Sequence, residues 1–218
     1  MKKFNKAIII GGSKGIGRSI ANNIRTNCKK IISCSRKEID TSNLNSVKKF
    51  IKKNTSTDIL VLNSGGPPPL KIDQIDEAIW YKYFNQLFLS YFLILKKIKI
   101  NKGGYIFYIS SSVIKEPGAS LVISSSLRTA FSSFLKSFSE DSRKDKITCI
   151  NIAPGPTNTQ RVKSLVNDIK KYKKKLPLGD LCNPDEIGKF VKYVVENRIK
   201  YLNGSVIYFD GSLLKSFL

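Results

Sequence analysis

Apolar and polar positions along the chain alternate between two periods, and this predicts strands separated by helices. Short continuous apolar runs, the pattern of buried strands, occur at residues 7–10, 58–62, 105–109 and 147–153. Apolar residues at helical spacing predict helices over 16–24, 44–53, 80–98 and 121–142. Strands that alternate with helices in this way form parallel sheets with helices on both faces. The pattern therefore predicts an α/β fold.

The first predicted strand leads into a cluster of glycines. Residues 7–17 read AIIIGGSKGIG, so the apolar run ends in a tight turn that precedes a helix. Strand, glycine loop and helix in this order form the context in which backbone N–H groups and a helix N-terminus bind the pyrophosphate of a dinucleotide, because only glycine lets the backbone approach so closely. An ordinary strand-to-helix turn is the alternative interpretation.

A second strand is expected at 30–35, and Arg36 and Lys37 follow its carboxyl end. In a dinucleotide-binding unit the residue at this place faces the adenosine ribose. An acid accepts a hydrogen bond from the 2′-hydroxyl, whereas a cation pairs with a 2′-phosphate. Arg36 has no acid beside it, and Lys14 of the glycine loop adds a second cation. We therefore expect NADP(H) to be favoured over NAD(H), with two solvated surface charges as the alternative.

Length and cysteine content limit the class of protein. The 218 residues, 41% of them hydrophobic, suffice for one sizeable core, and the absence of a linker or repeat favours a single domain over 1–218. The four cysteines show no C-x-x-C spacing and histidine is absent, so we expect no metal site and no histidine-based triad. The apolar runs are too short for a signal peptide or a membrane span, and we expect a cytoplasmic protein with reduced thiols and no membrane partner.

The formal net charge of +22 raises the question of nucleic-acid binding. The lysines are scattered over predicted helices and loops, with the densest run at 170–175. The sequence shows neither a basic helix-turn-helix nor an aromatic platform with basic neighbours. We therefore expect no specific nucleic-acid partner, only non-specific attraction of polyanions at low salt.

Several motifs resemble those of the short-chain dehydrogenase/reductase family. The glycines within 11–17 have the spacing of its T-G-x-x-x-G-I-G loop, with Ile10 in place of the threonine. The segment 63–66, Asn-Ser-Gly-Gly, is similar to its N-A-G motif, and 154–159, Pro-Gly-Pro-Thr-Asn-Thr, to its P-G-x-x-x-T loop. The resemblance covers essentially the whole chain. It implies a three-layer Rossmann-like doubly wound parallel sheet with one NAD(P)-binding domain.

The family places a helix and a third strand after the second strand, but here the short stretch 35–41 passes almost directly to the next helix. We expect the third strand to be vestigial or missing. The resemblance also implies that Asp40 contacts the adenine and that 165–175 forms a flexible substrate lid. The cofactor-binding residues that it implies are Gly11, Ser13, Lys14, Gly15, Ile16, Gly17, Ser35, Arg36, Asp40, Asn63, Ser64, Gly65, Pro154, Gly155, Thr157 and Thr159.

The family's catalytic signature is a serine after a strand, followed by Tyr-x-x-x-Lys on the next helix. Ser111 stands at the place of the serine, whereas Ser124 and Arg128 stand at the places of the tyrosine and the lysine. The chain therefore resembles a divergent branch, similar to 3-oxoacyl-acyl carrier protein reductases, that lacks the Tyr-x-x-x-Lys pair. By its spacing from Trp80, Leu87 falls at the place of a fourth catalytic residue, an asparagine.

The predicted catalytic residues are thus Ser111, Ser124 and Arg128. A serine hydroxyl lacks the acidity of a tyrosine and arginine stays charged, so we expect weakened acid–base catalysis with binding retained. Arg128 lies one helical turn from Ser124 and is expected to hold ribose hydroxyls or a substrate anion. Lys115 is a candidate proton donor, with a plain surface lysine as the alternative.

The resemblance implies an oxidoreductase that uses NADP(H) to transfer hydride to or from a small-molecule carbonyl or alcohol. The alternatives are a catalytically degenerate NADP(H)-binding regulatory protein and a non-redox enzyme that reuses the pocket. The helices at 80–98 and 121–142 carry more apolar residues than one sheet face needs. A homodimer or homotetramer formed through these helices is therefore expected.

Overall fold

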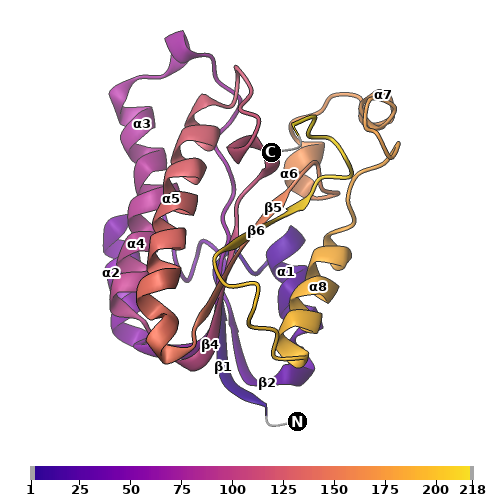
Figure 1. Cartoon of the computed structure of the whole chain (residues 1–218). Helices are drawn as coiled ribbons and strands as arrows, with labels where there is room; N and C mark the ends of the chain where they lie inside the picture. Colours follow the sequence, from indigo (N-terminus) through magenta and orange to yellow (C-terminus); the bar gives the residue numbers. More distant parts are fainter. Residues whose placement is uncertain (1–2, 217–218) are drawn as a thin grey trace.

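Six strands form one parallel sheet, in the order β2-β1-β3-β4-β5-β6. The computed structural model describes residues 3–216 of the chain (Figure 1). The strands are β1 (Phe4–Ile9), β2 (Cys28–Ser33), β3 (Ser56–Leu62), β4 (Lys99–Ile109), β5 (Thr148–Pro154) and β6 (Ser205–Phe209). From β1 the chain adds β2 on one side and the other strands on the opposite side, which confirms the predicted doubly wound sheet.

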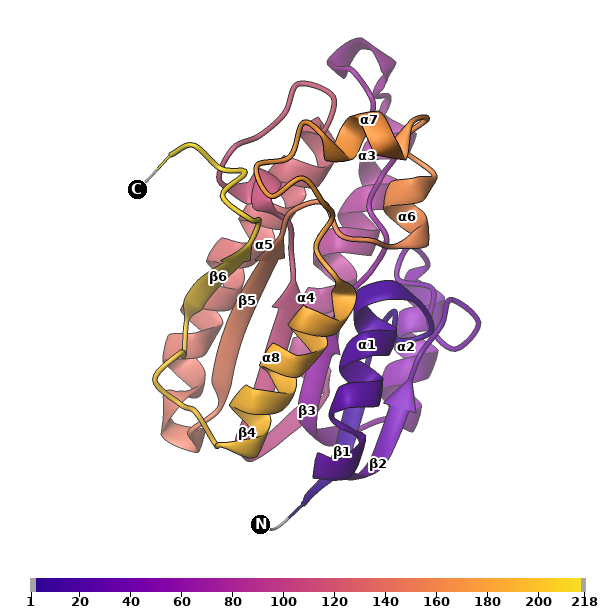
Figure 2. The ribbon, with the colours of Figure 1, turned by 90° about the vertical axis from the view of Figure 1, so that its right-hand side faces the viewer.

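Helices cover both faces of the sheet (Figures 1 and 2). On one face α1 (Gly15–Asn23) and α8 (Pro184–Glu196) pack side by side, and on the other lie α2 (Leu44–Lys53), α4 (Ser90–Lys97) and α5 (Val122–Asp141). The remaining α-helices are α3 (Glu77–Phe84), α6 (Gln160–Lys163) and α7 (Ile169–Lys173). The predicted three-layer α/β architecture is confirmed.

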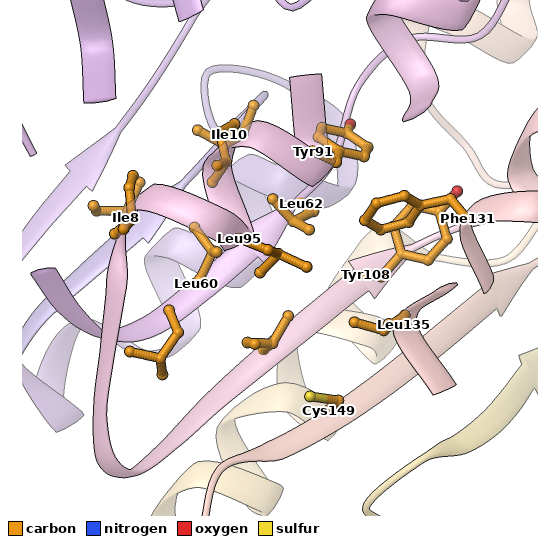
Figure 3. Close-up of a cluster of buried hydrophobic side chains, with 14 of the residues drawn as sticks. Ile8, Ile10, Leu60, Leu62, Tyr91, Leu95, Tyr108, Phe131, Leu135 and Cys149 are labelled. Atoms are coloured by element: carbon orange, nitrogen blue, oxygen red, sulfur yellow. The ribbon is translucent and has the colours of Figure 1, made fainter. Parts of the chain in front are cut away.

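A buried cluster of aliphatic and aromatic side chains joins the sheet to α2, α4 and α5 (Figure 3). Tyr91 of α4 and Phe131 of α5 are both fully buried, and their ring centroids lie 5.3 Å apart. Leu60 and Leu62 of β3 face this cluster, while Ile59 and Val61 face the core under α1 and α8. Such strands are apolar on both sides because helices cover both faces of the sheet.

The strand β2 lies at one edge of the sheet. Within the described residues, the chain passes from its last residue, Ser33, to the start of α2 without another strand. The expectation of a missing third strand is therefore confirmed. Lys29 and Lys30 of β2 are exposed. Lysines on an edge strand oppose pairing with a second chain, which protects the open edge.

The helix predicted over 80–98 begins three residues earlier in the structure, and a π-helical segment interrupts it. The carboxylate of Asp76 accepts a hydrogen bond from the backbone N–H of Ile79 at 2.7 Å, and this cap starts α3 at Glu77. Between α3 and α4, Asn85–Leu89 form a π-helical segment. A π-turn adds a residue to the helix and shifts the following side chains around its axis. Sequence spacing along this helix therefore no longer predicts which side chain faces the site.

All four cysteines are unpaired, and three of them are buried. Burial raises the pKa of Cys28 to about 11 and the pKa values of Cys34 and Cys149 to about 12, so these thiols stay protonated at neutral pH. Within residues 3–216, no group of three or more histidine, cysteine, aspartate or glutamate side chains is placed to hold a metal ion. No helix among these residues has the length and apolar character that crossing a membrane requires.

Candidate cofactor and substrate site

The glycine loop packs tightly against the loop that follows β3. Gly11 has a φ of +63°, and a Cβ atom there would collide with the carbonyl oxygen of Asn63. A Cβ atom at Gly17 would collide with the carbonyl oxygen of Gly11. The side chain of Asn63 completes this contact, since its Nδ2 donates a hydrogen bond to the Gly11 carbonyl oxygen at 3.0 Å. Only glycine fits both positions, and the N-terminus of α1 is thereby held beside the end of β3.

A cavity of about 550 Å³ lies where β1, β3, β4 and β5 end, and open α/β sheets bind their ligands at this edge. Loops from all four strand ends and the first residues of α1 line it. The predicted site residues in its lining are Gly11, Lys14, Gly15, Ile16, Asn63, Ser64, Gly65, Ser111, Ser124, Arg128, Pro154, Gly155, Thr157 and Thr159. The structure therefore brings most of the predicted cofactor and catalytic residues to one cavity.

Five predicted site residues lie outside the lining of this cavity, and they are Ser13, Gly17, Ser35, Arg36 and Asp40. Ser13 and Arg36 are exposed, whereas Gly17 is buried under the glycine loop. Oδ1 of Asp40 accepts hydrogen bonds from the backbone N–H and the hydroxyl of Ser42, at 2.9 and 2.7 Å. These bonds stabilise the turn before α2. The contact of Asp40 with an adenine stays a prediction.

The turn after β2 corrects one premise of the cofactor prediction, that no acid lies beside Arg36. Glu38 folds back on Ser35, and its Oε2 accepts hydrogen bonds from the Ser35 backbone N–H and hydroxyl, both at 2.6 Å. These bonds hold the pKa of the Glu38 carboxyl below its ordinary value. The strand end thus carries a carboxylate as well as a guanidinium, and the two favour opposite choices between NAD(H) and NADP(H).

The three predicted catalytic residues lie close together on the cavity wall. Ser111 follows β4, is half-buried and shares the cavity lining with the other two, and its hydroxyl accepts a hydrogen bond from the backbone N–H of Val113 at 3.5 Å. Ser124 and Arg128 lie one turn apart on α5, and Arg128 Nε donates to Ser124 Oγ at 3.2 Å. Ser124 and Arg128 thus lie on one face of the helix that follows Ser111, and their correspondence to the tyrosine and lysine of the family signature stays a prediction.

Arg128 is the most buried charged side chain of the site, with 5% of its surface exposed. Its Nη1 donates to the carbonyl oxygens of Ile109 and Ser110, at 3.0 and 3.3 Å. Its Nη2 donates to the carbonyl oxygen of Ser64 at 3.4 Å. The guanidinium therefore ties the ends of β3 and β4 to α5. Arg128 therefore supplies fixed hydrogen-bond donors at this wall of the cavity.

Tyr91, Tyr108 and Lys115 are not placed to donate a proton to a ligand in the cavity, because none of them belongs to its lining. Tyr91 and Tyr108 are fully buried outside the cavity lining, and burial raises the pKa of both hydroxyls, that of Tyr108 to about 12. Lys115 also lies outside the lining, with its Nζ 5.5 Å from the ring centroid of Tyr208. The suggestion that Lys115 donates the proton therefore has no support in this geometry.

Gln86 lies outside the cavity lining but contacts a residue of it, and the sequence interpretation missed this contact. Its side chain is buried, and its Nε2 donates a hydrogen bond to the carbonyl oxygen of Gly65 at 2.5 Å. Leu87, which spacing places at the fourth catalytic position, instead packs fully buried against Ile123 and Leu127. The π-helical segment explains this one-residue difference. The signal in the sequence was a single glutamine within an otherwise apolar helix face.

Arg161 and Tyr172 are polar lining residues of the cavity that were not singled out as site residues. Arg161 belongs to α6. Thr159 caps the N-terminus of this helix, since its hydroxyl accepts a hydrogen bond from the backbone N–H of Val162 at 3.5 Å. Its guanidinium donates a hydrogen bond to the carbonyl oxygen of Pro67. Tyr172 of α7 is half-buried within the predicted lid, and burial raises the pKa of its hydroxyl. The position of Arg161, two residues after the end of the P-G-x-x-x-T loop, was the available signal.

The fold and the cavity define a Rossmann-like α/β protein whose site lies at the carboxyl ends of a parallel sheet. A family model described as enoyl-(acyl carrier protein) reductase matches residues 38–213. The chain belongs to this family, a group of short-chain dehydrogenase/reductase oxidoreductases. The family resemblance of the sequence is therefore confirmed.

Curated relatives and solved structures agree with this assignment. The chain is 21% identical to the uncharacterized oxidoreductase YvaG of Bacillus subtilis, over 96% of each chain. It is 23% identical to the 3-oxoacyl-[acyl-carrier-protein] reductase FabG of Chlamydia trachomatis, over 95% of this chain and 96% of the relative. A short chain dehydrogenase family protein from Francisella tularensis has a TM-score of 0.86 at 22% identity, over 96% of this chain and 98% of the other. These comparisons do not support the alternative of a regulatory protein.

Proposed function

We propose that the protein is an NADP(H)-dependent oxidoreductase that transfers hydride to or from a small-molecule carbonyl or alcohol without a Tyr-x-x-x-Lys pair. One observation carries this proposal: a single cavity joins the glycine loop to Ser111, Ser124 and Arg128. A dinucleotide at the glycine loop and a substrate at these three side chains would share that cavity. The angucycline C-6 ketoreductase LanV, whose structure contains bound NADP, has the same fold with a TM-score of 0.88 at 17% identity, over 97% of this chain and 96% of that one.

The residues present fit a dinucleotide. The glycine loop lines the cavity, and the N-terminus of α1 adds backbone N–H groups and a favourable dipole for a pyrophosphate. The segments 63–65 and 154–159 line the same cavity and would flank the nicotinamide half. When bound, the reduced cofactor supplies a hydride from its nicotinamide C4.

The chain's own residues act on the substrate oxygen. Ser111 donates a hydrogen bond to the carbonyl oxygen and polarises it, and the charge of Arg128 stabilises the negative charge that develops there. As the hydride adds to the carbonyl carbon, the π electron pair of the C=O bond moves to the oxygen, which takes a proton from water. A well-placed general acid contributes about 10²- to 10⁴-fold, so turnover of simple ketones is expected to be slow.

Oxidation of NADPH with a panel of ketones and aldehydes tests this function. We expect slow, substrate-dependent turnover in the unmodified protein and its loss in Ser111→Ala. The matched control is Ser126→Ala, which removes an exposed hydroxyl from α5. Rapid turnover that survives Ser111→Ala would place the chemistry elsewhere.

The cofactor preference is a separate prediction. NADPH is expected to bind more tightly than NADH, because Arg36 and Lys14 would pair with the 2′-phosphate. Fluorescence titration of both cofactors measures the preference, which Arg36→Ala should reduce and the neighbouring control Lys37→Ala should leave in place. Glu38→Gln should strengthen NADPH binding several-fold, because it removes the carboxylate at the end of β2. Equal affinities, or a preference that Arg36→Ala does not change, would contradict the assignment.

A homodimer or homotetramer through α3, α4 and α5 is also proposed. Half-buried phenylalanines continue along these helices, with Phe84 and Phe88 stacked at 5.5 Å between centroids and Phe92 and Phe134 at 5.6 Å. A further copy of the chain would cover this stripe. Light scattering at moderate salt should show a dimer or tetramer, and Phe92→Lys should shift it toward monomer. A monomer in the unmodified protein would contradict the proposal.

A further inference from the structure

Two arginines from distant parts of the chain converge on one point of the cavity. A Cβ atom at Gly66 would lie 3.8 Å from a terminal guanidinium nitrogen, Nη2, of Arg128 and 3.9 Å from Nη2 of Arg161. The hydroxyl oxygen of Ser124 would lie 3.9 Å from the same point. The absent side chain of Gly66 therefore leaves a space that two cations and one hydroxyl border.

Neither arginine has a carboxylate partner among the described residues. Arg128 donates to three carbonyl oxygens and one hydroxyl, and Arg161 donates to the carbonyl oxygen of Pro67. The ion pairs within residues 3–216 all lie elsewhere, at Lys173–Asp180, Lys189–Asp185 and Lys192–Glu196. Two guanidinium groups close together without a counter-ion repel one another, and an anion between them would relieve this repulsion.

The charge of the whole cavity has one sign. Its charged lining residues are Lys14, Arg128 and Arg161, and no aspartate or glutamate of the described chain is among them. Burial and the nearby charge of Arg128 lower the pKa of Arg161, although the neighbouring Tyr83 opposes this shift. The wall of the cavity also includes apolar side chains from four segments, which are Val113, Leu121, Val162, Leu165, Val166 and Leu213. A ligand with an anionic end and an apolar body matches this lining.

We propose that Arg161, together with Arg128, binds an oxyanion of the substrate, a carboxylate or a phosphate, in the space beside Gly66. This inference rests on the proposed function and names its substrate class: a carbonyl or alcohol compound that carries an oxyanion next to an apolar body. Arginine suits this role because its planar donors match two oxygen atoms of either group. The phosphates of the cofactor belong to another part of the site, at the glycine loop and the turn after β2.

Unreactive probes of matched size test the proposal on the NADPH-loaded protein. Isothermal titration with benzoate, phenyl phosphate and the neutral benzamide gives the binding constants, and an NADPH titration of each variant gives the cofactor affinity. We expect benzoate or phenyl phosphate to bind at least about tenfold more tightly than benzamide, because a hydrogen bond to a charged group contributes a binding free energy of that size. The stronger of the two anions identifies the oxyanion.

Three variants locate the effect. Arg161→Gln should remove the preference for the anion and leave the NADPH affinity unchanged, whereas Arg161→Lys should restore part of the preference because it keeps the charge. Lys171→Gln removes one exposed positive charge from α7 outside the cavity and should change neither the anion preference nor the NADPH affinity.

Equal binding of benzamide and both anions, or an anion preference that survives Arg161→Gln, would overturn the inference. A loss of NADPH affinity in Arg161→Gln with the anion preference intact would overturn it too, and would assign Arg161 to the cofactor. Failure of the unmodified protein to bind NADPH would instead contradict the proposed function.

Discussion

Replacing Ser124 with tyrosine and Arg128 with lysine is expected to raise kcat/KM for a generic ketone by about 10²- to 10⁴-fold, the usual contribution of a positioned general acid. Ser124 lines the cavity one helical turn from Arg128, so the new side chains would have the spacing that lets a lysine lower the pKa of a tyrosine. Oxidation of NADPH against ketone concentration gives kcat/KM for the double variant and the unmodified protein.

The matched control is Ser124→Phe with Arg128→Lys, which has the same size and charge but no hydroxyl. It should show no gain. An equal rise in both double variants would mean that the change acts through packing and not through proton transfer. If neither gains activity while both bind NADPH as the unmodified protein does, the backbone frame at α5 is not that of a catalytic Tyr-x-x-x-Lys pair.

Arg128→Met is expected to be the most destabilising single substitution of the site. It removes the donors that satisfy carbonyl oxygens at the ends of β3 and β4, and buried polar groups left without a partner cost about 1–3 kcal/mol each. A total loss of about 3 kcal/mol would lower Tm by about 6–12 °C in a chain of this size. Thermal unfolding followed by circular dichroism measures the change.

Lys136→Met is the control, since it also replaces a cationic side chain with methionine, but at an exposed position of α5. Surface substitutions of this kind usually change the free energy of unfolding by less than about 0.5 kcal/mol. If Arg128→Met lowered Tm no more than this control, the hydrogen bonds of Arg128 would not hold the strand ends together, and its role would be limited to ligand binding.

The main elements could be predicted because their signals are local. Four apolar runs with glycine or polar residues at their ends correspond to β1, β3, β4 and β5, and the short connection over 35–41 correctly predicts the missing strand. Gly17 was predictable for the same reason, since its close approach to the Gly11 carbonyl oxygen lies within a single strand-loop-helix unit, whereas Gly11 approaches Asn63 after β3.

Three features of the structure could not be predicted from the spacing of residues in the sequence. The π-helical segment at Asn85–Leu89 is a local deviation with no distinct sequence pattern, and it brings Gln86 to the site instead of Leu87. The bond of Glu38 to Ser35 depends on the exact path of the turn after β2. The guanidinium groups of Arg161 and Arg128 approach the same point beside Gly66 through the tertiary fold, and no spacing in the sequence encodes this.

The central claim is that this cavity transfers hydride between a nicotinamide and a carbonyl compound. The most direct measurement uses NADPH deuterated at the transferring C4 position, with mass spectrometry of the alcohol formed from a ketone panel. The account predicts an alcohol that carries one deuterium on the former carbonyl carbon, and loss of this product in Ser111→Ala. Tight binding of NADPH with no deuterium in any alcohol would contradict it.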